Sequence, residues 1–421
     1  MTTEARATQD LPAVFNPLEA GYTEWPYDQY RRLRDNDPIH RSDLVHGWVI
    51  TRFDDVNTVL RDASVSSNIE NATPTPITEA EQERSEAKGR GSKTVVLLDD
   101  PDHARLRKLL APPFKARAVE DVREMIERRV SQAVDSLRAE FGSDAEFDLI
   151  GDFAYPLPVE IFCEMLGVPD EDHPKFRHWT MCVARNLDPV MSDEERAVCQ
   201  QGVDEMWEYL EDQANRKRAE PTDDLMSTLV HAEDGGDTMN HQELMGQLMT
   251  LYVAGHEPTA GLVGNGMLGL FRHPDQLDRL TGNPDAVDAD LLRNAISELL
   301  RFDGPNQFVR RVATQEMRIG DTPISAGDVM YLSPGSANHD PRRWGDTADE
   351  VIVDRADAQA HMQFGAGIHS CLGMHLARLQ IEVVLQAVFT QMRDLEIAGE
   401  PEWSTRMVIR SLNRLPVRCK L

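Results

Sequence analysis

The most informative stretch of this chain is Phe364-Gly365-Ala366-Gly367-Ile368-His369-Ser370-Cys371-Leu372-Gly373. It surrounds a single cysteine with small residues, and a histidine lies two positions before that cysteine. Gly365 and Gly367 allow the backbone to turn tightly and to approach a bound group closely. Phe364 can shield the sulfur from water. A thiolate that accepts backbone N–H groups and lies against a large planar cofactor needs such surroundings, whereas a lone cysteine in a glycine-rich loop is more often an ordinary buried thiol.

The size of the chain suits one large globular unit with a deep core. It has 421 residues, of which 41% are hydrophobic and 28% charged, and we find no linker-like stretch between packed segments. Residues 1–25 read as a polar N-terminal arm. We therefore expect one domain over residues 26–421.

The charge balance and the cysteines limit the partners and the compartment. The net charge of −28 argues against nucleic acid and anionic membranes as general partners. Five cysteines without the spacing of a disulfide framework indicate a reduced, cytoplasmic protein. The N-terminus has no apolar run of signal-peptide or membrane-span length, so we expect a soluble protein that does not enter the membrane.

Hydrophobic periodicity predicts a mainly α fold with a small β region. Residues 242–272 form a helix that is apolar almost all round and should cross the interior. Its several glycines weaken it intrinsically, so we expect close contact with neighbouring helices there. Residues 48–51 and 316–333 read as strands, and residues 64–93 as a long structureless stretch, which is usually functional.

The segment Ala254-Gly255-His256-Glu257-Pro258-Thr259 lies in the middle of the long helix. His256-Glu257 could begin the zinc motif HExxH, but Ala260 occupies the position of the second histidine and excludes that reading. Pro258 has no N–H, so the carbonyl of Ala254 loses its helical donor. We expect a kink there and a free carbonyl group.

A further pattern is Glu298-Leu299-Leu300-Arg301, which places a carboxylate and a guanidinium on one helix face. Such pairs are common in helices. Together with the cysteine stretch and the segment around Glu257, however, the pattern resembles the cytochrome P-450 family over nearly the whole chain. The resemblance adds Arg355 as a third member of a buried network that locks the region before Cys371.

The resemblance implies the cytochrome P-450 fold, with haem b (iron protoporphyrin IX) between the long central helix and the cysteine loop. Cys371 is then the proximal ligand of the iron, and its thiolate makes the iron electron-rich. The haem propionates would be held by four residues that match family positions. These residues are His103, Arg107, Arg311 and His369.

On the opposite side of the haem, the resemblance implies an acid followed by a threonine that together deliver protons during oxygen reduction. Glu257 supplies the acid, but Pro258 stands where the threonine is usual, and Thr259 comes one residue late, about 100° further round the helix. We expect Glu257 to be the main proton relay and Thr259 a secondary one. A paired or solvated helix carboxylate is the plainer alternative for Glu257.

By resemblance, the protein is a monooxygenase that inserts one atom of O2 into a small or mid-sized hydrophobic substrate. Only about 50 residues follow Cys371, so we expect electrons from a separate ferredoxin and ferredoxin reductase. The nearest alternative keeps the fold but performs oxidative coupling, desaturation or peroxide-driven oxidation, because of Pro258. A second alternative is a haem-binding protein without turnover.

A cluster of basic residues stands out in this acidic chain. It comprises Arg105, Arg107, Lys108, Lys115 and Arg117. It forms either a solvated helix face or a docking patch for an acidic ferredoxin, since complementary charge speeds encounter. The docking hypothesis predicts that exchange of Arg105 and Lys108 for glutamate slows electron transfer.

Overall fold

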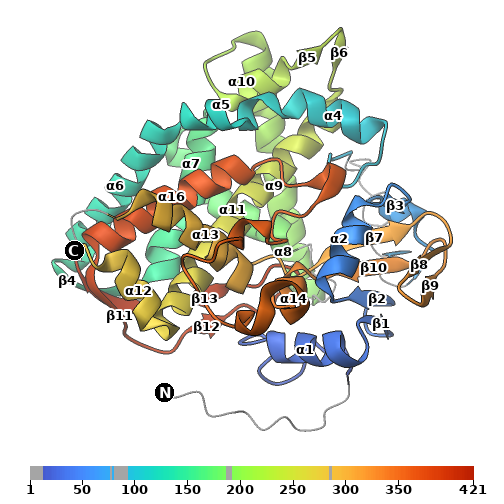
Figure 1. Ribbon diagram of the computed structural model, residues 1–421. Helices are drawn as coiled ribbons and strands as arrows, with labels where there is room; N and C mark the ends of the chain where they lie inside the picture. Colours follow the sequence, from blue (N-terminus) through green and yellow to red (C-terminus); the bar gives the residue numbers. More distant parts are fainter. Residues whose placement is uncertain (1–12, 76–77, 80–92, 186–191, 284–286) are drawn as a thin grey trace.

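The computed structural model describes residues 13–75, 78–79, 93–185, 192–283 and 287–421. The helices are α1 (Tyr27–Asn36), α2 (Phe53–Arg61), α4 (Asp102–Leu110), α5 (Ala116–Glu120), α6 (Arg123–Phe141), α7 (Pro156–Met165), α8 (His173–Arg185), α9 (Asp193–Ala219), α10 (Leu225–Val230), α11 (His241–Arg272), α12 (Pro274–Thr281), α13 (Ala289–Asp303), α14 (Pro334–Ala337), α15 (Pro341–Trp344) and α16 (Met374–Gln391). Helices dominate the molecule (Figure 1), which confirms the expected mainly α class.

The strands of the described residues are short and form one five-stranded, one three-stranded and three two-stranded sheets. They are β1 (Ile39–Ser42), β2 (Gly47–Ile50), β3 (Val65–Ser66), β4 (Asp144–Asp148), β5 (Glu233–Asp234), β6 (Asp237–Thr238), β7 (Val309–Ala313), β8 (Met317–Ile319), β9 (Thr322–Ile324), β10 (Val329–Leu332), β11 (Arg393–Ile397), β12 (Glu402–Trp403), β13 (Leu412–Arg414) and β14 (Pro416–Lys420). A five-stranded sheet of order β1-β2-β10-β7-β3 lies at one side of the helical body, at the right of Figure 1.

The helix α11 runs through the interior, as its composition predicts. Asn240 and Glu243 form a reciprocal capping box that fixes its start. Its glycines do allow close packing: a Cβ on Gly255 would lie 2.4 Å from the ring of Phe162 on α7, and Gly264 is packed as tightly. The helix continues through Pro258 without a break in its assignment. Neighbouring backbone and side chains therefore compensate for the intrinsic weakness of this sequence.

The sequence predicts a structureless stretch over residues 64–93, but the structure shows that its first part is ordered. Val65 and Ser66 form β3 and pair with β7 at the edge of the five-stranded sheet. The Asp99 carboxylate then accepts hydrogen bonds from the backbone of Ser67 and from the Ser66 hydroxyl. Strand pairing and a remote acid thus order this part. Residues 76–77 and 80–92 lie outside the described residues.

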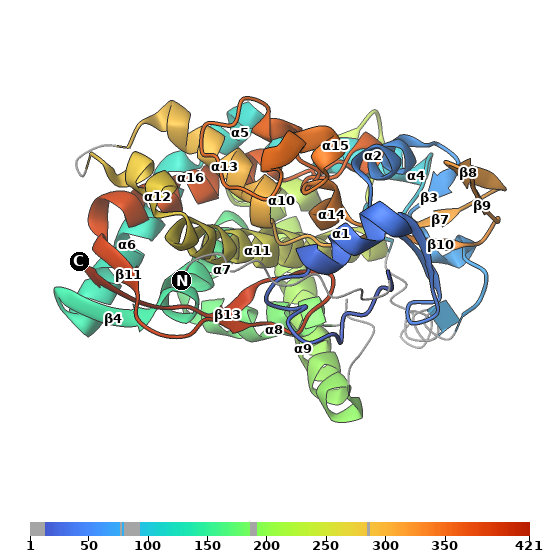
Figure 2. The same ribbon diagram turned by 60° about the horizontal axis from the view of Figure 1, so that its bottom comes forward.

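Two contacts join the ends of the chain to the body. The strand β14 lies between β11 and β4, so residues near the C-terminus pair with residues 144–148; Figure 2 shows β4 and β11 beside the C-terminus. The described part of the expected arm, residues 13–25, also packs on the core, with Phe15 and Tyr22 buried. Arg410 donates to the carbonyls of Thr23 and Glu24.

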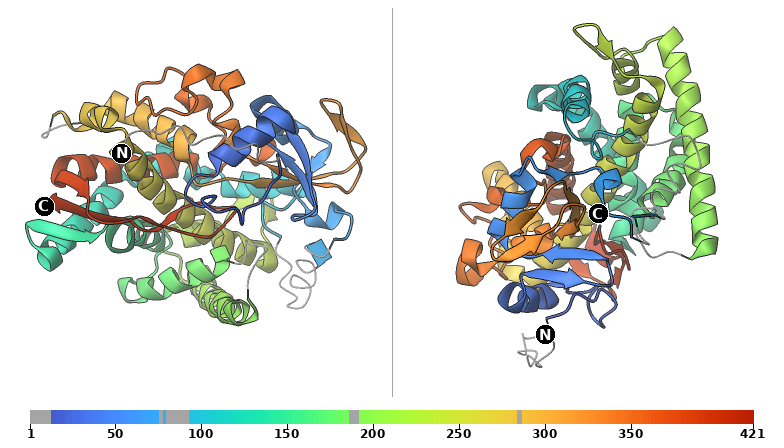
Figure 3. Two further views of the ribbon diagram at one scale, coloured as in Figure 1. Left: turned by 90° about the horizontal axis from the view of Figure 1, so that it is seen from below. Right: turned by 90° about the vertical axis from the view of Figure 1, so that its right-hand side faces the viewer.

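The helices α8 and α9 pack against each other on the outside of the molecule (Figure 3). Cys163 on α7, Cys182 on α8 and Cys199 on α9 are buried free thiols. Within the described ranges, every helix is too short or too polar to span a membrane.

Candidate active site

The loop that carries Cys371 is built by its own backbone. The Cys371 N–H donates to the carbonyl of Phe364 (2.8 Å), which closes the loop just before α16. Gly367 has a φ of +71°, and a Cβ there would lie 2.3 Å from the carbonyl oxygen of Leu60 on α2. Only glycine fits this position, because any side chain would meet backbone in a conformation that L residues rarely adopt.

The sulfur of Cys371 lies in a mixed electrostatic environment. Burial raises the pKa of the thiol, whereas a hydrogen bond from the Gly373 N–H and the positive charge of Arg107 lower it. A backbone N–H directed at the sulfur is the contact that the sequence pattern requires. Metal coordination would hold this cysteine as the thiolate regardless of the balance in the free thiol.

The four expected propionate residues come together beside this loop, since Arg107 also acts electrostatically on both His103 and His369. The rings of His103 on α4 and His369 lie 4.2 Å apart between centroids, and Arg311 on β7 is buried close enough to act on His369. Burial, then Arg311 and His103, lowers the pKa of His369 to about 3, and burial lowers the pKa of Arg311 to about 10. These polar groups therefore lie close enough to act on one another electrostatically.

Arg107 also has a backbone partner. Its guanidinium donates to the carbonyl of Ser370 (2.7 Å), so it ties α4 to the residue before the cysteine. His103 and Arg107 lie one turn apart on the same helix. The ring of His103 faces that of His369, and Arg107 holds the loop.

A group with anionic arms fits this arrangement. The Nε2 atoms of His103 and His369 are buried and lack a hydrogen-bond partner within the described residues, and an unpaired buried polar atom is costly. Among the described residues, the guanidinium of Arg311 donates a hydrogen bond only to the carbonyl of Arg310. Carboxylates placed here would satisfy both imidazoles and the guanidinium, as haem propionates would.

The acidic residue of the long helix has two firm partners. Glu257 is buried; its Oε1 accepts from the Tyr155 hydroxyl (2.9 Å), and its Oε2 accepts from Arg406 (2.6 Å). Thr259 is also buried, and its hydroxyl donates to the carbonyl of Gly255 (3.2 Å). Both expected relay residues are thus engaged within the protein. Neither Tyr155 nor Arg406 lies in a recognisable sequence motif, so their contact with Glu257 could not be predicted.

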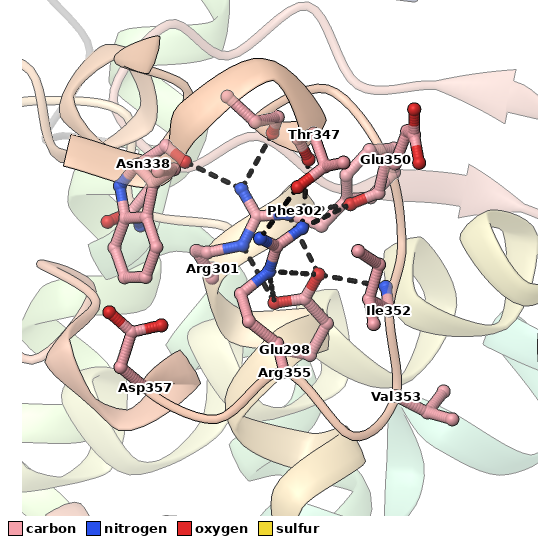
Figure 4. Close-up of polar contacts among 12 residues, drawn as sticks. Glu298, Arg301, Phe302, Asn338, Thr347, Glu350, Ile352, Val353, Arg355 and Asp357 are labelled. Atoms are coloured by element: carbon pink, nitrogen blue, oxygen red, sulfur yellow. Dashed lines mark hydrogen bonds and ion pairs between the residues drawn. The ribbon is translucent and has the colours of Figure 1, made fainter. Parts of the chain in front are cut away.

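The expected scaffold network is confirmed. Arg301 donates to both oxygens of Glu298 (2.7 and 2.8 Å), and Arg355 donates to both at 3.0 Å. Figure 4 shows the two guanidinium groups around the one carboxylate. Backbone carbonyls of Asn338, Ala348 and Glu350 accept the remaining Arg301 donors, so the buried charges are fully hydrogen-bonded.

Two members of the basic cluster are paired with acidic residues of the chain itself. Arg105 forms ion pairs with Glu243 and Asp237, and Lys108 pairs with Asp234 (2.5 Å). These acids belong to the β5–β6 hairpin and the start of α11, and Figure 1 shows the hairpin beside α4. Lys115 and Arg117 remain exposed.

The comparisons with known proteins agree with this geometry. The family model Cytochrome P450 matches residues 48–393. The chain is 34% identical to a vitamin D(3) 25-hydroxylase of Pseudonocardia autotrophica, covering 93% of both proteins, and 35% identical to the cytochrome P450 monooxygenase PikC of Streptomyces venezuelae, covering 99% of this chain and 95% of that protein. The solved structure of the bacillaene polyketide synthase cytochrome P450 PksS of Bacillus subtilis superposes with a TM-score of 0.86 at 31% identity, over 97% of this chain and all of that one.

Proposed function

Because the chain belongs to the cytochrome P450 family, whose members are haem-binding oxidoreductases, we propose that it is a monooxygenase acting on a small or mid-sized hydrophobic compound. The substrate C–H group, O2, two electrons and two protons become C–OH and water. The observation that carries this proposal is the cysteine loop together with the buried Nε2 atoms of His103 and His369, which lack a hydrogen-bond partner among the described residues.

Thiolate-ligated haem supplies the oxygen activation when it is bound. The chain contributes ligation by Cys371 and an N–H donated to its sulfur by Gly373. His103, Arg107, Arg311 and His369 bind the anionic arms of the cofactor, and Arg107 also keeps the loop in place through Ser370. Glu257 passes protons, and Thr259 assists it.

The named activities of the relatives support a substrate class. One relative is named as a hydroxylase of vitamin D(3), and another serves polyketide biosynthesis. We therefore propose a sterol-sized or polyketide-derived substrate. A spectral screen of such compounds, read as a shift of the haem absorption band, tests this choice.

Electrons come from a separate ferredoxin and its reductase in this proposal. Since Arg105 and Lys108 are paired within the chain, the exposed Lys115 and Arg117 are the better candidates for contact with an acidic partner. Five free cysteines support a reducing, cytoplasmic environment.

A second reaction on the same fold is favoured by Pro258. Its position beside Glu257 leaves Thr259, whose hydroxyl is bonded to Gly255, as the helix hydroxyl nearest in sequence. Oxidative coupling, desaturation or peroxide-driven oxidation would then replace hydroxylation. Turnover with hydrogen peroxide that far exceeds turnover with the ferredoxin system would support this alternative.

The decisive test is a Cys371→Ser exchange. Reduced wild-type protein under carbon monoxide should give the red-displaced Soret band of thiolate-ligated haem, and the variant should bind haem without that band. An unchanged band in the variant would refute the ligand assignment, and with it the proposed function.

A further inference from the structure

The clamp around Glu257 joins three distant parts of the chain. Glu257 comes from the middle of α11, Tyr155 lies at the start of α7, and Arg406 lies between β12 and β13. The side chains of Glu257 and Arg406 are 2% and 14% exposed, so water screens their attraction only weakly. Both carboxylate oxygens are occupied, one by the phenol and one by the guanidinium.

Arg406 is itself held in place before it meets the acid. Its Nε donates to the Ser404 hydroxyl and its Nη2 to the Ser411 hydroxyl, each at 3.0 Å. The Ser404 N–H in turn donates to the Ser411 carbonyl (2.9 Å), which keeps the two serines together. The guanidinium therefore presents its remaining nitrogen to Glu257 in a fixed direction, and less side-chain entropy is lost when the pair forms.

Tyr155 supplies a hydroxyl that remains a donor. Burial, and then the Glu257 carboxylate, raise the pKa of Tyr155, so the phenol keeps its proton. The carbonyl of the same residue lies 3.1 Å from Nε2 of His256. Burial lowers the pKa of His256 to about 4, so its ring is neutral and donates from Nε2. His256 thus holds the Tyr155 carbonyl, while Glu257 accepts a hydrogen bond from the Tyr155 hydroxyl.

The helix offers no competing hydroxyl to the acid. Pro258 follows Glu257 directly, and the Thr259 hydroxyl donates to Gly255. Among the described residues, the hydroxyl in contact with Glu257 therefore comes from Tyr155, 102 positions away in the chain.

We propose that Tyr155 and Arg406 are positioning residues for proton delivery, which fix the Glu257 carboxylate and give it a hydroxyl partner from outside its own helix. This inference rests on the proposed role of Glu257 as the relay. The Glu257 carboxylate accepts a proton from water or from the Tyr155 hydroxyl, which water then reprotonates. Glu257 passes that proton on to water and returns to the carboxylate, a form that the positive charge of Arg406 favours. No electron moves in these steps.

The test uses the holoenzyme with its electron donors and compares Tyr155→Phe, Arg406→Gln, Arg406→Lys and Glu257→Gln. Matched controls are Tyr22→Phe, which removes another buried phenol hydroxyl bonded to Tyr30, and Arg410→Lys, which weakens the buried pair with Asp303. The measured quantities are the share of electrons recovered as hydrogen peroxide and the solvent isotope effect on turnover. A third, independent of turnover, is the infrared band of the Glu257 carboxyl group in glutamate-labelled protein, assigned with Glu257→Gln.

We expect Tyr155→Phe and Arg406→Gln to raise the ratio of peroxide to product roughly tenfold and to increase the isotope effect. Arg406→Lys should recover part of the loss, and both controls should behave like the wild type in these measurements. The infrared band should move from carboxylate toward carboxylic acid in Arg406→Gln, because a buried carboxylate without its cation binds a proton.

Two results separate the possible errors. If Glu257→Gln keeps the wild-type peroxide ratio and isotope effect, the relay role in the proposed function is wrong. If Glu257→Gln is impaired while Tyr155→Phe, Arg406→Gln and Arg406→Lys match the wild type, the relay stands and the positioning inference is overturned. A variant that loses its fold, seen by circular dichroism, leaves the decision to Tyr155→Phe and Arg406→Lys.

Discussion

Replacement of Glu298 by glutamine removes the one negative charge between two buried guanidinium groups. Glu298 accepts hydrogen bonds from Arg301, Arg355 and the N–H of Ile352. The side chains of Glu298 and Arg301 are fully buried, and that of Arg355 is 8% exposed. The amide NH2 of the new glutamine would face the N–H donors of the arginines. Arg301 and Arg355 would also repel each other, because no negative charge would lie between them.

The cost follows from the burial of the network. Loss of one partner from a buried ion pair destabilises a protein by about 3 to 5 kcal/mol, a large part of the total stability of a typical domain. Unfolding entropy scales with chain length and is about 0.9 kcal/mol per kelvin at 60 °C for 421 residues. The midpoint of thermal unfolding should therefore fall by roughly 3 to 6 °C.

The assay is calorimetry of wild type, Glu298→Gln and a matched control, Glu146→Gln. Glu146 pairs with Arg418 at 2.9 Å, but both side chains are more than half exposed (58% and 56%). Its loss should lower the midpoint by about 1 °C or less, because surface pairs contribute about 1 kcal/mol at most. Equal shifts in the two variants would refute the argument that burial makes the Glu298 network costly to break.

Three further changes test other parts of the site. Gly367→Ala should lower haem occupancy and the stability of the haem-free protein, since its φ is +71° and the new Cβ would lie 2.3 Å from a carbonyl oxygen; full occupancy in absorbance titration would contradict the backbone argument. Burial, and then its arginine neighbours, lower the pKa of His361 to about 3. As the pH falls below about 6.5, His361 therefore binds a proton in the unfolded chain but not in the folded protein. The free energy of unfolding decreases from there toward pH 3. His361→Gln should flatten this part of the curve of unfolding free energy against pH, and an unchanged slope would show that His361 does not contribute. Exchange of Lys115 and Arg117 for glutamate should slow reduction by an acidic ferredoxin in stopped-flow absorbance and weaken its salt dependence, whereas unchanged kinetics would exclude these residues from the docking surface.

Much of the site could be predicted because many of its functional residues lie in short contiguous sequence motifs. The loop before Cys371 needs glycine at fixed positions, since its shape comes from backbone turns and from contact with Leu60. The Glu298 and Arg301 pair is local to one helix, and its spacing places both groups on one face. The apolar composition of α11 likewise predicts burial from the sequence alone.

The contacts that escaped prediction join side chains far apart in the chain. Arg406 meets Glu257 across 149 positions, and Arg105 meets Glu243 across 138. Neither pair has a periodicity or a turn signal that would place it. The basic cluster therefore looked like a free patch in the sequence, although acidic residues around β5 and β6 compensate part of its charge.

The cysteine loop is shaped by its backbone, whereas the surroundings of Glu257 are formed by side chains. A Cβ at position 367 collides with main chain, so the cysteine side of the site tolerates no substitution there. The surroundings of Glu257 consist of a phenol and a guanidinium, each of which one exchange can remove while the helix stays intact. In the proposed function, ligation of the iron and supply of protons are thus separable. A substitution of Tyr155 or Arg406 should keep the absorption spectrum of thiolate-ligated haem and change only the ratio of hydrogen peroxide to product.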